Sequence, residues 1–511
     1  MEAELEPWHA ELAKVRRQNN ANSLPAARKA GQLLDSLEST LAEQSTPATP
    51  TAHLAALATV LQQLVTSPAS SEETHELIAA GLYLLAIAAP HVPAAVLRAK
   101  ADDIIALLGA ALPALLSDAD KAAALKSLLS VAQPLYAAFA DKPKRLNKPD
   151  AAQLYNTLLP LLADARPKVR RRAHEFIWTV VFPSEAVKRE AAHPYAERTA
   201  EHVVRALTAA AKEARSSSGK KDSNAHASTK HEEAIARLNA LCAFVKGAAP
   251  AWPVSVRTTP HCGVDYRLKG AQGLPSLLAV ILSLPRLQSQ YLSRASYDVL
   301  ELLLDPESAS PTSTETISGA LEALLALRPP PTAVVVLPGW LGALETVMVA
   351  FARIDATSCG AIVMSHLEGC LAFCATNVES DEVRARAERT VKGLVRYCVP
   401  TEKLADVLEL VSKAMKDLRW KGRGQPHVLG VLAAVVSRCR GLEKVEARAL
   451  LAGHVKMVGE MRTKKHFEYR QQVDEVIGAA VEVGGPRWLL EVLPLNLVTA
   501  EGCVAPLCLL D

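Results

Sequence analysis

Aromatic residues are scarce in this chain. Phe, Tyr and Trp make up 4% of its 511 residues, whereas half of the residues are hydrophobic. A large globular enzyme core usually buries more aromatic surface than this. Ala and Leu supply the apolar surface instead, and both favour helices. Because 511 residues are also too many for one compact core, the composition predicts several domains or an elongated array of packed helices.

A strong net charge, a signal peptide and a membrane span are also missing. The formal net charge is +3, so we expect nucleic-acid contact only at local patches. The nine cysteines are scattered, and no signal-peptide pattern precedes them, which favours the cytosol or the nucleus. The longest apolar runs, Leu77–Pro90 and Ile104–Leu116, are shorter than the roughly 20 residues that cross a bilayer. We interpret both runs as buried helices.

Motifs for catalysis, phosphate binding and metal binding are not found either. The stretch SSSGKK (216–221) lacks the first glycine and the last Ser or Thr of a phosphate-binding loop, and Gly422 and Gly424 follow no predicted strand. His366, Cys370 and Cys374 could share one helix face and hold a metal. Free cysteine in such a Leu- and Ala-rich window is typically buried core, however. We therefore expect no enzyme activity, no cofactor and no metal.

What the sequence does contain is leucine at helical spacing. Leucines recur in this way within a predicted helix from about Pro25 to Glu43, and turns with Pro or Asp separate similar segments along the chain. Val334–Leu337 could be extended, but it is short and bounded by prolines. This pattern predicts an all-α fold, a HEAT/armadillo-like helical repeat superhelix or α-solenoid.

The window 158–181 carries the clearest repeat signature. Pro160 sits within a Leu-rich helix, Asp164 follows in the turn, and Val169, Arg170 and Ala173 begin the next helix. An aspartate at such a turn can cap the free N–H groups of the helix that follows. The pattern resembles the HEAT repeat, in which the arginine characteristically pairs with the turn aspartate of a neighbouring repeat. A second copy repeats the spacing at Val383, Arg384 and Ala387. The alternative is a generic helical bundle with chance matches.

Several ordered windows resemble the ribosomal RNA-processing protein 12 family. They include HVPAAVLRAKADDIIALL (91–108) and DARPKVRRRAHEFI (164–177), with further windows at 12–44, 49–64, 284–304 and 459–497. The resemblance implies a non-catalytic ribosome biogenesis factor of the nucleus and nucleolus, with shuttling to the cytoplasm left open. It implies binding to pre-rRNA and pre-ribosomal particles, mainly pre-40S, and to ribosome-assembly and nuclear export proteins. It also implies support of rRNA processing and of particle export.

The resemblance divides the chain unevenly. We expect N-terminal HEAT-like repeats over 1–214, a disordered Ser/Lys-rich loop over 215–231, and continuing repeats of the central region over 232–497. An insertion at 255–273 and the end at 498–511 are atypical of the family, whose members are normally much longer. Our hypothesis is that both segments are gene-model artefacts, and the alternative is a natural short form.

Basic clusters are the best candidates for RNA contact, because cations neutralise phosphates and an exposed Trp can stack on an unpaired base. The candidates are Lys142, Lys144, Arg145 and Lys148, then Arg171 and Arg172, and finally Arg419, Trp420, Lys421 and Arg423, with Lys413 and Lys416 nearby. Solvated helix faces and a buried Trp420 are the alternatives, and KPKR (142–145) could be a nuclear import signal. An importin-type transport receptor or a generic helical-repeat adaptor stays open as another function, although such receptors tend to be strongly acidic.

Overall fold

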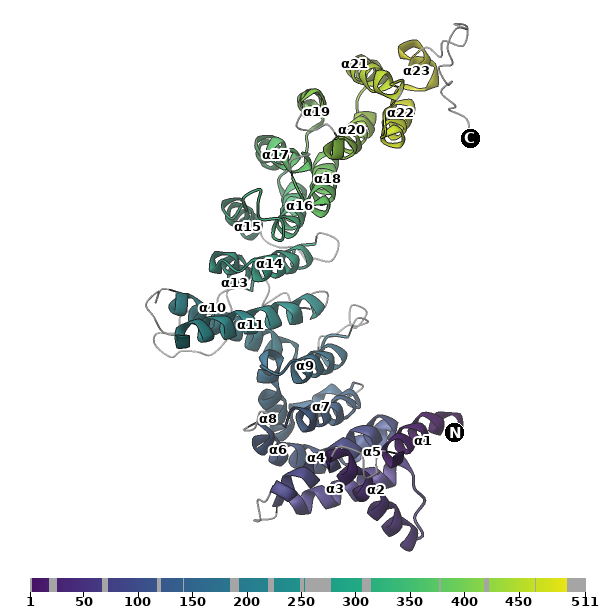
Figure 1. Cartoon of the computed structure of the whole chain (residues 1–511), viewed down its shortest axis with the longest axis vertical. Helices are drawn as coiled ribbons and strands as arrows, with labels where there is room; N and C mark the ends of the chain where they lie inside the picture. The colour runs from purple at the N-terminus through teal and green to yellow at the C-terminus, as the bar shows by residue number, and fades with distance from the viewer. Residues whose placement is uncertain are drawn as a thin grey trace. The chain divides into compact units, whose positions relative to one another are not determined.

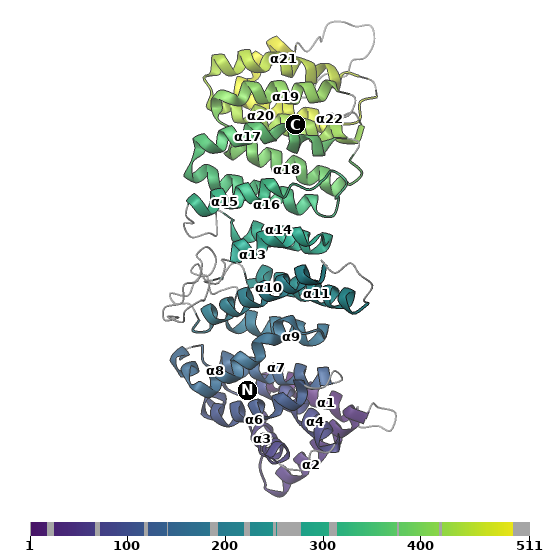
Figure 2. The same cartoon turned by 90° about the vertical axis from the view of Figure 1, so that its left-hand side faces the viewer.

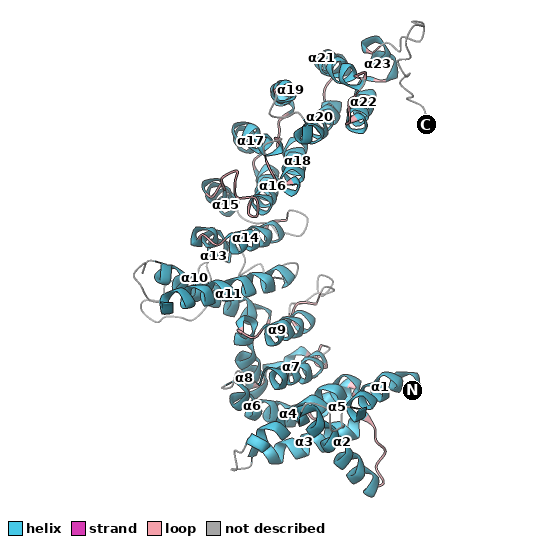
Figure 3. Ribbon diagram, in the orientation of Figure 1, coloured by secondary structure: helices cyan, strands magenta, loops and turns pink. Residues whose placement is uncertain are grey.

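The described part of the chain is helical throughout. The computed structural model describes residues 2–17, 25–66, 72–116, 121–140, 142–183, 193–218, 225–248, 252, 277–305, 314–375, 378–417, 422–464 and 466–493. Within these ranges every regular element is a helix and none is a strand, as the colouring in Figure 3 shows. The chain divides into two compact units, Met1–Ser276 (unit 1) and Leu277–Asp511 (unit 2). The predicted all-α repeat fold is therefore confirmed.

Unit 1 is built from two layers of helices. One layer stacks α2, α4, α7 and α9 in order, and the other stacks α3, α6 and α8 beside it (Figure 1). Its elements are α1 (Glu2–Arg17), α2 (Pro25–Glu43), α3 (Pro50–Thr66), α4 (Glu72–Ala88), η1 (Ala89–His91), α5 (Ala94–Ala99), α6 (Ala101–Leu116), α7 (Ala122–Ala137), η3 (Pro143–Asn147), α8 (Pro149–Leu158), η4 (Leu159–Ala163), α9 (Pro167–Val180), α10 (Ala196–Ser218) and α11 (Ala225–Ala248).

Unit 2 repeats the two-layer plan. Helices α14, α16, α18, α20 and α22 pack one on the next and form what we call the even-numbered layer, while α15, α17, α19 and α21 lie on its other side (Figures 1 and 2). Its elements are α13 (Leu277–Ser283), η7 (Leu284–Leu287), α14 (Gln290–Leu303), α15 (Thr314–Ala326), α16 (Leu337–Ile354), α17 (Ala356–Leu371), η8 (Ala372–Cys374), α18 (Asp381–Tyr397), η9 (Thr401–Lys403), α19 (Leu404–Lys416), η11 (Gly422–Gly424), α20 (Gln425–Arg438), η12 (Cys439–Gly441), α21 (Lys444–Arg462), α22 (Arg470–Gly484) and α23 (Pro486–Val492).

Proline sets several helix boundaries. Pro149 and Pro167 are the first residues of α8 and α9, where the missing N–H leaves no hydrogen bond unmade. Pro160 is not inside an α-helix: α8 ends at Leu158, and Pro160 lies in the 3-10 helix η4. Because proline cannot donate to a preceding carbonyl, the chain tightens into a 3-10 turn there.

The predicted disordered loop over 215–231 is wrong at both of its ends. Residues 215–218 are the last turn of α10, and residues 225–231 are the first turns of α11. Glu213 joins the two helices, because the guanidinium of Arg237 on α11 donates to its carboxylate at 2.6 Å. Pairing with a neighbouring helix outweighs the polar composition. Residues 219–224, and the atypical segments 255–273 and 498–511, lie outside the described residues.

Two helices of unit 2, α16 and α17 with η8, are long and apolar enough to cross a bilayer. In α16 the apolar residues meet other helices of unit 2, and 67% of its most apolar window is buried. Length and composition alone do not separate such a core helix from a membrane span, and the packing of α16 favours the core.

Candidate nucleic-acid interface

The basic connector, which we define as residues 142–148, lies on the surface of unit 1 between α7 and α8. Lys142, Lys144 and Arg145 are exposed, and their side chains form no hydrogen bond or ion pair with any other described residue. Lys148 differs, because its ammonium nitrogen lies 2.6 Å from a carboxylate oxygen of Asp102 on α6. Three of the four predicted cations are therefore open to a phosphate, and the fourth already has a partner.

A group of buried tyrosines holds the connector in place. The hydroxyl of Tyr195 donates to the carbonyl of Leu146. Leu146 lies in η3, and its side chain is buried. The Tyr195 ring stacks on Tyr155 with centroids 4.3 Å apart, and the Tyr136 hydroxyl donates to the carbonyl of Ala151 at 2.7 Å. Burial raises the pKa of Tyr195 to about 12, so its hydroxyl keeps the proton that it donates. The sequence did not predict this cluster, in which a chain with few aromatic residues concentrates several of them.

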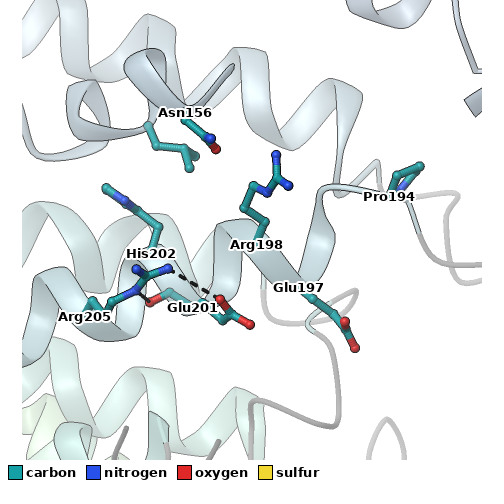
Figure 4. Close-up of a pocket in the computed structure, with 8 residues that line it drawn as sticks. Asn156, Pro194, Glu197, Arg198, Glu201, His202 and Arg205 are labelled. Carbon is teal, nitrogen blue, oxygen red and sulfur yellow. Dashed lines mark hydrogen bonds and ion pairs between the residues drawn. The ribbon is translucent and has the colours of Figure 1, made fainter. Parts of the chain in front are cut away.

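A hollow of about 570 Å³ opens between α8 and the start of α10 (Figure 4). Arg198 extends from α10 towards Asn156 of α8, and its guanidinium carbon lies 5.6 Å from the centroid of the Tyr195 ring. The hydroxyl of the same tyrosine donates to the carbonyl of Leu146 in the connector. Arg198 was not among the residues predicted from the sequence to contact RNA. It follows Tyr195 by three residues, which places the two side chains on one face of a helix.

The other titratable groups of the hollow add little positive charge. Arg205 lies 3.4 Å from Glu201 on its own helix. Burial, and then the charge of Arg205, lowers the pKa of His202, so this imidazole is neutral at pH 7. Arg198 is thus the cation of the hollow that makes no ion pair with another described residue.

The first repeat signature forms a turn that is held differently from the expectation. Val169 and Ala173 are fully buried on α9. The carboxylate of Asp164 accepts from the backbone N–H of Arg166 at 2.8 Å and from its guanidinium, so it orders the turn and does not cap α9. Arg170 donates to the main-chain carbonyl of Asp164 at 2.8 Å. Among the described residues Arg170 forms no ion pair with an aspartate of a neighbouring repeat, so the expected pairing is wrong.

The ion pairs around Asp164 also affect its acidity. Burial raises the pKa of this carboxyl, but the hydrogen bonds and charge of Arg166 outweigh burial and leave the pKa below its usual value.

Further along α9, Arg171 and Arg172 both reach Glu175, at 3.4 and 3.1 Å. Neither of these two predicted RNA contacts is therefore free of a carboxylate.

The second repeat signature is buried more deeply, in unit 2. The Ser380 hydroxyl caps α18 by accepting from the N–H of Val383 at 3.3 Å. Val383, Arg384 and Ala387 are all fully buried. The guanidinium of Arg384 donates to the carbonyl of Val378 and to the carboxylate of Asp381, again within its own turn.

The third predicted cluster is described only in part. Lys413 and Lys416 are exposed on α19, and Arg423 is exposed in η11. Arg419, Trp420 and Lys421 lie outside the described residues. This cluster belongs to unit 2 and the connector to unit 1.

The cysteine and histidine window shows no metal geometry in the part of the chain that is described. Cys370 and Cys374 are buried, and burial raises the pKa of the Cys370 thiol to about 11. A buried thiol that stays protonated is a poor metal ligand. Packing in the core accounts for both residues.

A charged row on the even-numbered layer of unit 2 was not predicted. Arg386 of α18 lies 2.8 Å from Glu301 of α14, although α16 runs between these helices. Gly342 of α16 makes room, since a side chain there would overlap both charged groups. Arg294 of α14 bridges to Glu382 of α18 at 3.1 Å in the same way, above Gly339. The signal that the sequence offered is a pair of glycines three residues apart on α16, Gly339 and Gly342.

Comparison with known proteins agrees with this fold and with the resemblance seen in the sequence. The family described as RRP12-like, N-terminal HEAT repeats, matches residues 26–247. The family described as ribosomal RNA-processing protein 12, HEAT repeats, matches residues 377–503. The second match continues past residue 497, where the sequence predicted that the resemblance ends. Together the two matches cover more than half of the chain.

One curated relative and several solved structures are similar over nearly the whole chain. A putative ribosomal RNA-processing protein 12 from Schizosaccharomyces pombe is 23% identical over 96% of this chain, which spans 38% of that relative's length. The karyopherin Kap121p bound to the SUMO protease Ulp1p has a TM-score of 0.51 at 11% identity, covering 95% of this chain and 42% of that one. Kap121p bound to Nup53p has a TM-score of 0.50 at 11% identity, with 95% and 42% covered.

The karyopherin likeness shows a shared solenoid fold and nothing about function, because its sequence identity is so low. The two family matches fall in order along the chain, one within unit 1 and one within unit 2. On these matches, the chain belongs to the ribosomal RNA-processing protein 12 family of HEAT-repeat proteins.

Proposed function

We propose that this chain is a non-catalytic ribosome biogenesis factor that binds precursor ribosomal particles and supports rRNA processing. The observation that carries the proposal is the ordered pair of family matches, since both are to proteins described as ribosomal RNA-processing protein 12 or like it. The finer parts of the proposal are binding to pre-40S particles, contact with assembly and export proteins, support of nuclear export, and residence in the nucleus and nucleolus.

The basic connector of unit 1 supports direct contact with RNA. Lys142, Lys144 and Arg145 are exposed without a carboxylate partner among the described residues, and Arg198, over the ring of Tyr195, is a fourth such cation of unit 1. Cations in this state release counterions when they meet phosphates, which makes binding depend on salt. The tyrosine cluster fixes the connector, so less entropy is lost when RNA binds.

Affinity purification of the tagged full chain tests the proposed function. We expect pre-rRNA and ribosome-assembly proteins to be recovered. Recovery of transport cargo without pre-rRNA would instead support an importin-type receptor and would overturn the proposal.

A second measurement tests the surface of unit 1. The variant with Lys142, Lys144 and Arg145 all changed to Ala should bind single-stranded RNA with a salt slope lower by about 2, because each lost phosphate contact removes about 0.7. Lys148→Ala is the matched control, and it should change the slope less because Lys148 already pairs with Asp102. Equal slopes for the triple variant and the unchanged chain would remove the connector from the interface.

A further inference from the structure

Two neighbouring hollows in the even-numbered layer of unit 2 meet at Tyr397. The larger, of about 810 Å³, lies between α18, α20 and α22 and includes Arg396, Arg438 and Arg440 in its wall. The smaller, of about 280 Å³, lies over α14, α16 and α18 and includes Arg386 and Arg389. Tyr397, the last residue of α18, lines both. We call the two hollows together the Tyr397 groove.

Three carboxylates of the groove already have hydrogen-bond or ion-pair partners within unit 2. Glu301 pairs with Arg386 at 2.8 Å, and Glu482 pairs with Arg440. Glu345 accepts from the hydroxyl of Thr390 at 3.3 Å and lies 3.9 Å from Arg386.

Three arginines of the groove remain without an acid. Among the described residues, Arg389, Arg396 and Arg438 have no carboxylate within ion-pair distance. The Nε atom of Arg438 is buried with no hydrogen-bond partner in the described part of the chain. Cations that line a groove with no acid beside them favour an anion there.

Tyr397 supplies a flat surface in the middle of these cations. Its side chain is 55% exposed, whereas most of the aromatic residues in the described part of the chain are buried. The guanidinium carbon of Arg396 lies 5.2 Å from the centroid of its ring. An exposed aromatic ring flanked by arginines binds unpaired nucleotides, because the ring stacks on the base and the guanidinium groups bind the adjacent phosphates.

We propose that the Tyr397 groove binds an unpaired stretch of RNA, with a base against Tyr397 and phosphates on Arg389, Arg396 and Arg438. This assignment rests on the proposed function and adds a second RNA contact to that of unit 1. A duplex cannot offer a base to the ring, because its bases are already stacked and paired. An acidic peptide would satisfy the arginines but would leave the exposed ring without a partner, so RNA fits both features.

The test uses the full chain and a fluorescein-labelled uridine 12-mer, which has no structure of its own, in an anisotropy titration. Tyr397→Ala should weaken binding about 5- to 160-fold, the range for loss of one stacked base, without changing the salt slope. The double variant Arg389→Gln, Arg396→Gln should lower the slope by about 1.4. Tyr291→Ala is the matched control, since Tyr291 is a 75% exposed tyrosine on α14 of the same unit and should have no effect. Circular dichroism confirms that each variant is folded.

The outcomes separate this proposal from the proposed function. If Tyr397→Ala and Tyr291→Ala both bind like the unchanged chain while the connector variant is weakened, the groove assignment is overturned and RNA binding by unit 1 stands. If the unchanged chain does not bind the 12-mer and recovers no pre-rRNA, the proposed function fails as well. Binding of a labelled glutamate 12-mer that is lost in the double variant Arg389→Gln, Arg396→Gln, with RNA binding unchanged in that variant and in Tyr397→Ala, would assign the groove to an acidic protein partner instead.

Discussion

The two units hold their positive charge in different ways. In unit 1, three cations of the connector project from a 3-10 turn with no acid beside them among the described residues, and a buried tyrosine fixes the backbone beneath. In unit 2, arginines on the even-numbered layer alternate with carboxylates and lie over glycines of the next helix. The charge of these three cations in unit 1 is therefore available to a ligand, whereas much of the charge in unit 2 joins one repeat to another. Arg389, Arg396 and Arg438 depart from that second pattern.

The two repeat arginines give the largest expected difference between the units. Arg384→Ala should lower the free energy of unfolding by about 3 kcal/mol, because it leaves a cavity and an unpaired buried carbonyl at Val378. Arg170→Ala should lower it by about 1 kcal/mol, since Arg170 is half-buried and makes one such bond. Urea denaturation, with hydrogen exchange in α9 and α18 as a local measure, gives both values. Equal losses at the two sites would show that their turns are equivalent after all.

Two glycines of the even-numbered layer should respond to alanine with opposite signs. Gly342→Ala should lower the stability of unit 2 by about 1 kcal/mol, since the new methyl group displaces the ion pair between Glu301 and Arg386. Gly478 on α22 has open space around it, so Gly478→Ala should raise the stability by up to about 1 kcal/mol through helix propensity. Thermal unfolding of both variants checks this. A stabilised Gly342→Ala would mean that the bridge across α16 contributes nothing.

Two carboxylates of the same layer should show opposite dependence on pH. Burial raises the pKa of Glu345, so ionisation of this group costs stability at neutral pH, and the cost disappears as the pH falls through the raised pKa. For Glu388, burial raises the pKa but hydrogen bonds from His427 and Lys392 outweigh it, so the folded pKa is low. The stability from Glu388 is present above the unfolded pKa and is lost as the pH falls through the folded value.

The two matching variants make that contrast measurable. Glu388→Gln should lower the free energy of unfolding at pH 7 by about 1 kcal/mol, as for a charge-assisted hydrogen bond, and by less at pH 4. Glu345→Gln should leave it unchanged or raise it slightly at pH 7. Urea midpoints between pH 4 and pH 7 test both signs, and a loss with Glu345→Gln at pH 7 would contradict the second.

The smallest effect concerns the one paired cation of the connector. Asp102→Asn frees Lys148 and should change stability by less than about 0.5 kcal/mol, because the pair is on the surface. The same change should steepen the salt slope of RNA binding, since Lys148 becomes available to a phosphate. Glu402→Asn, which removes one exposed charge from unit 2, is the control. If both substitutions shift the slope equally, net charge is responsible and the position of Lys148 is not.

Local periodicity predicted the helices well, but it could not predict which side chains would meet across repeats. The helix expected from about Pro25 to Glu43 has those bounds in the structure, because its leucines specify one buried face. The Val-Arg pair placed α9 and α18 correctly. The arginines of these pairs, however, bind acceptors in their own turns. Only the packing of the turn decides that Arg166 binds the carboxylate of Asp164 while Arg170 binds its carbonyl.

The candidate interface was predicted in part. The connector stood out because four cations occur within seven residues, whereas Arg198 and Tyr397 are single residues whose surroundings come from other helices. Residues 225–231 were read as a loop because their composition is polar, but α10 and α11 stabilise each other along their length. Contacts between distant segments are the part that a single sequence does not show.

The bridges above α16 have a consequence for how unit 2 comes apart. In an ideal helical array each repeat interacts only with its immediate neighbours, so the ends fray one repeat at a time. Glu301 with Arg386, and Arg294 with Glu382, couple α14 directly to α18 and skip the helix between them. Loss of α14 therefore removes two ionic contacts from α18 at once. Under pulling force or in denaturant, α14, α16 and α18 should unfold together as one cooperative unit.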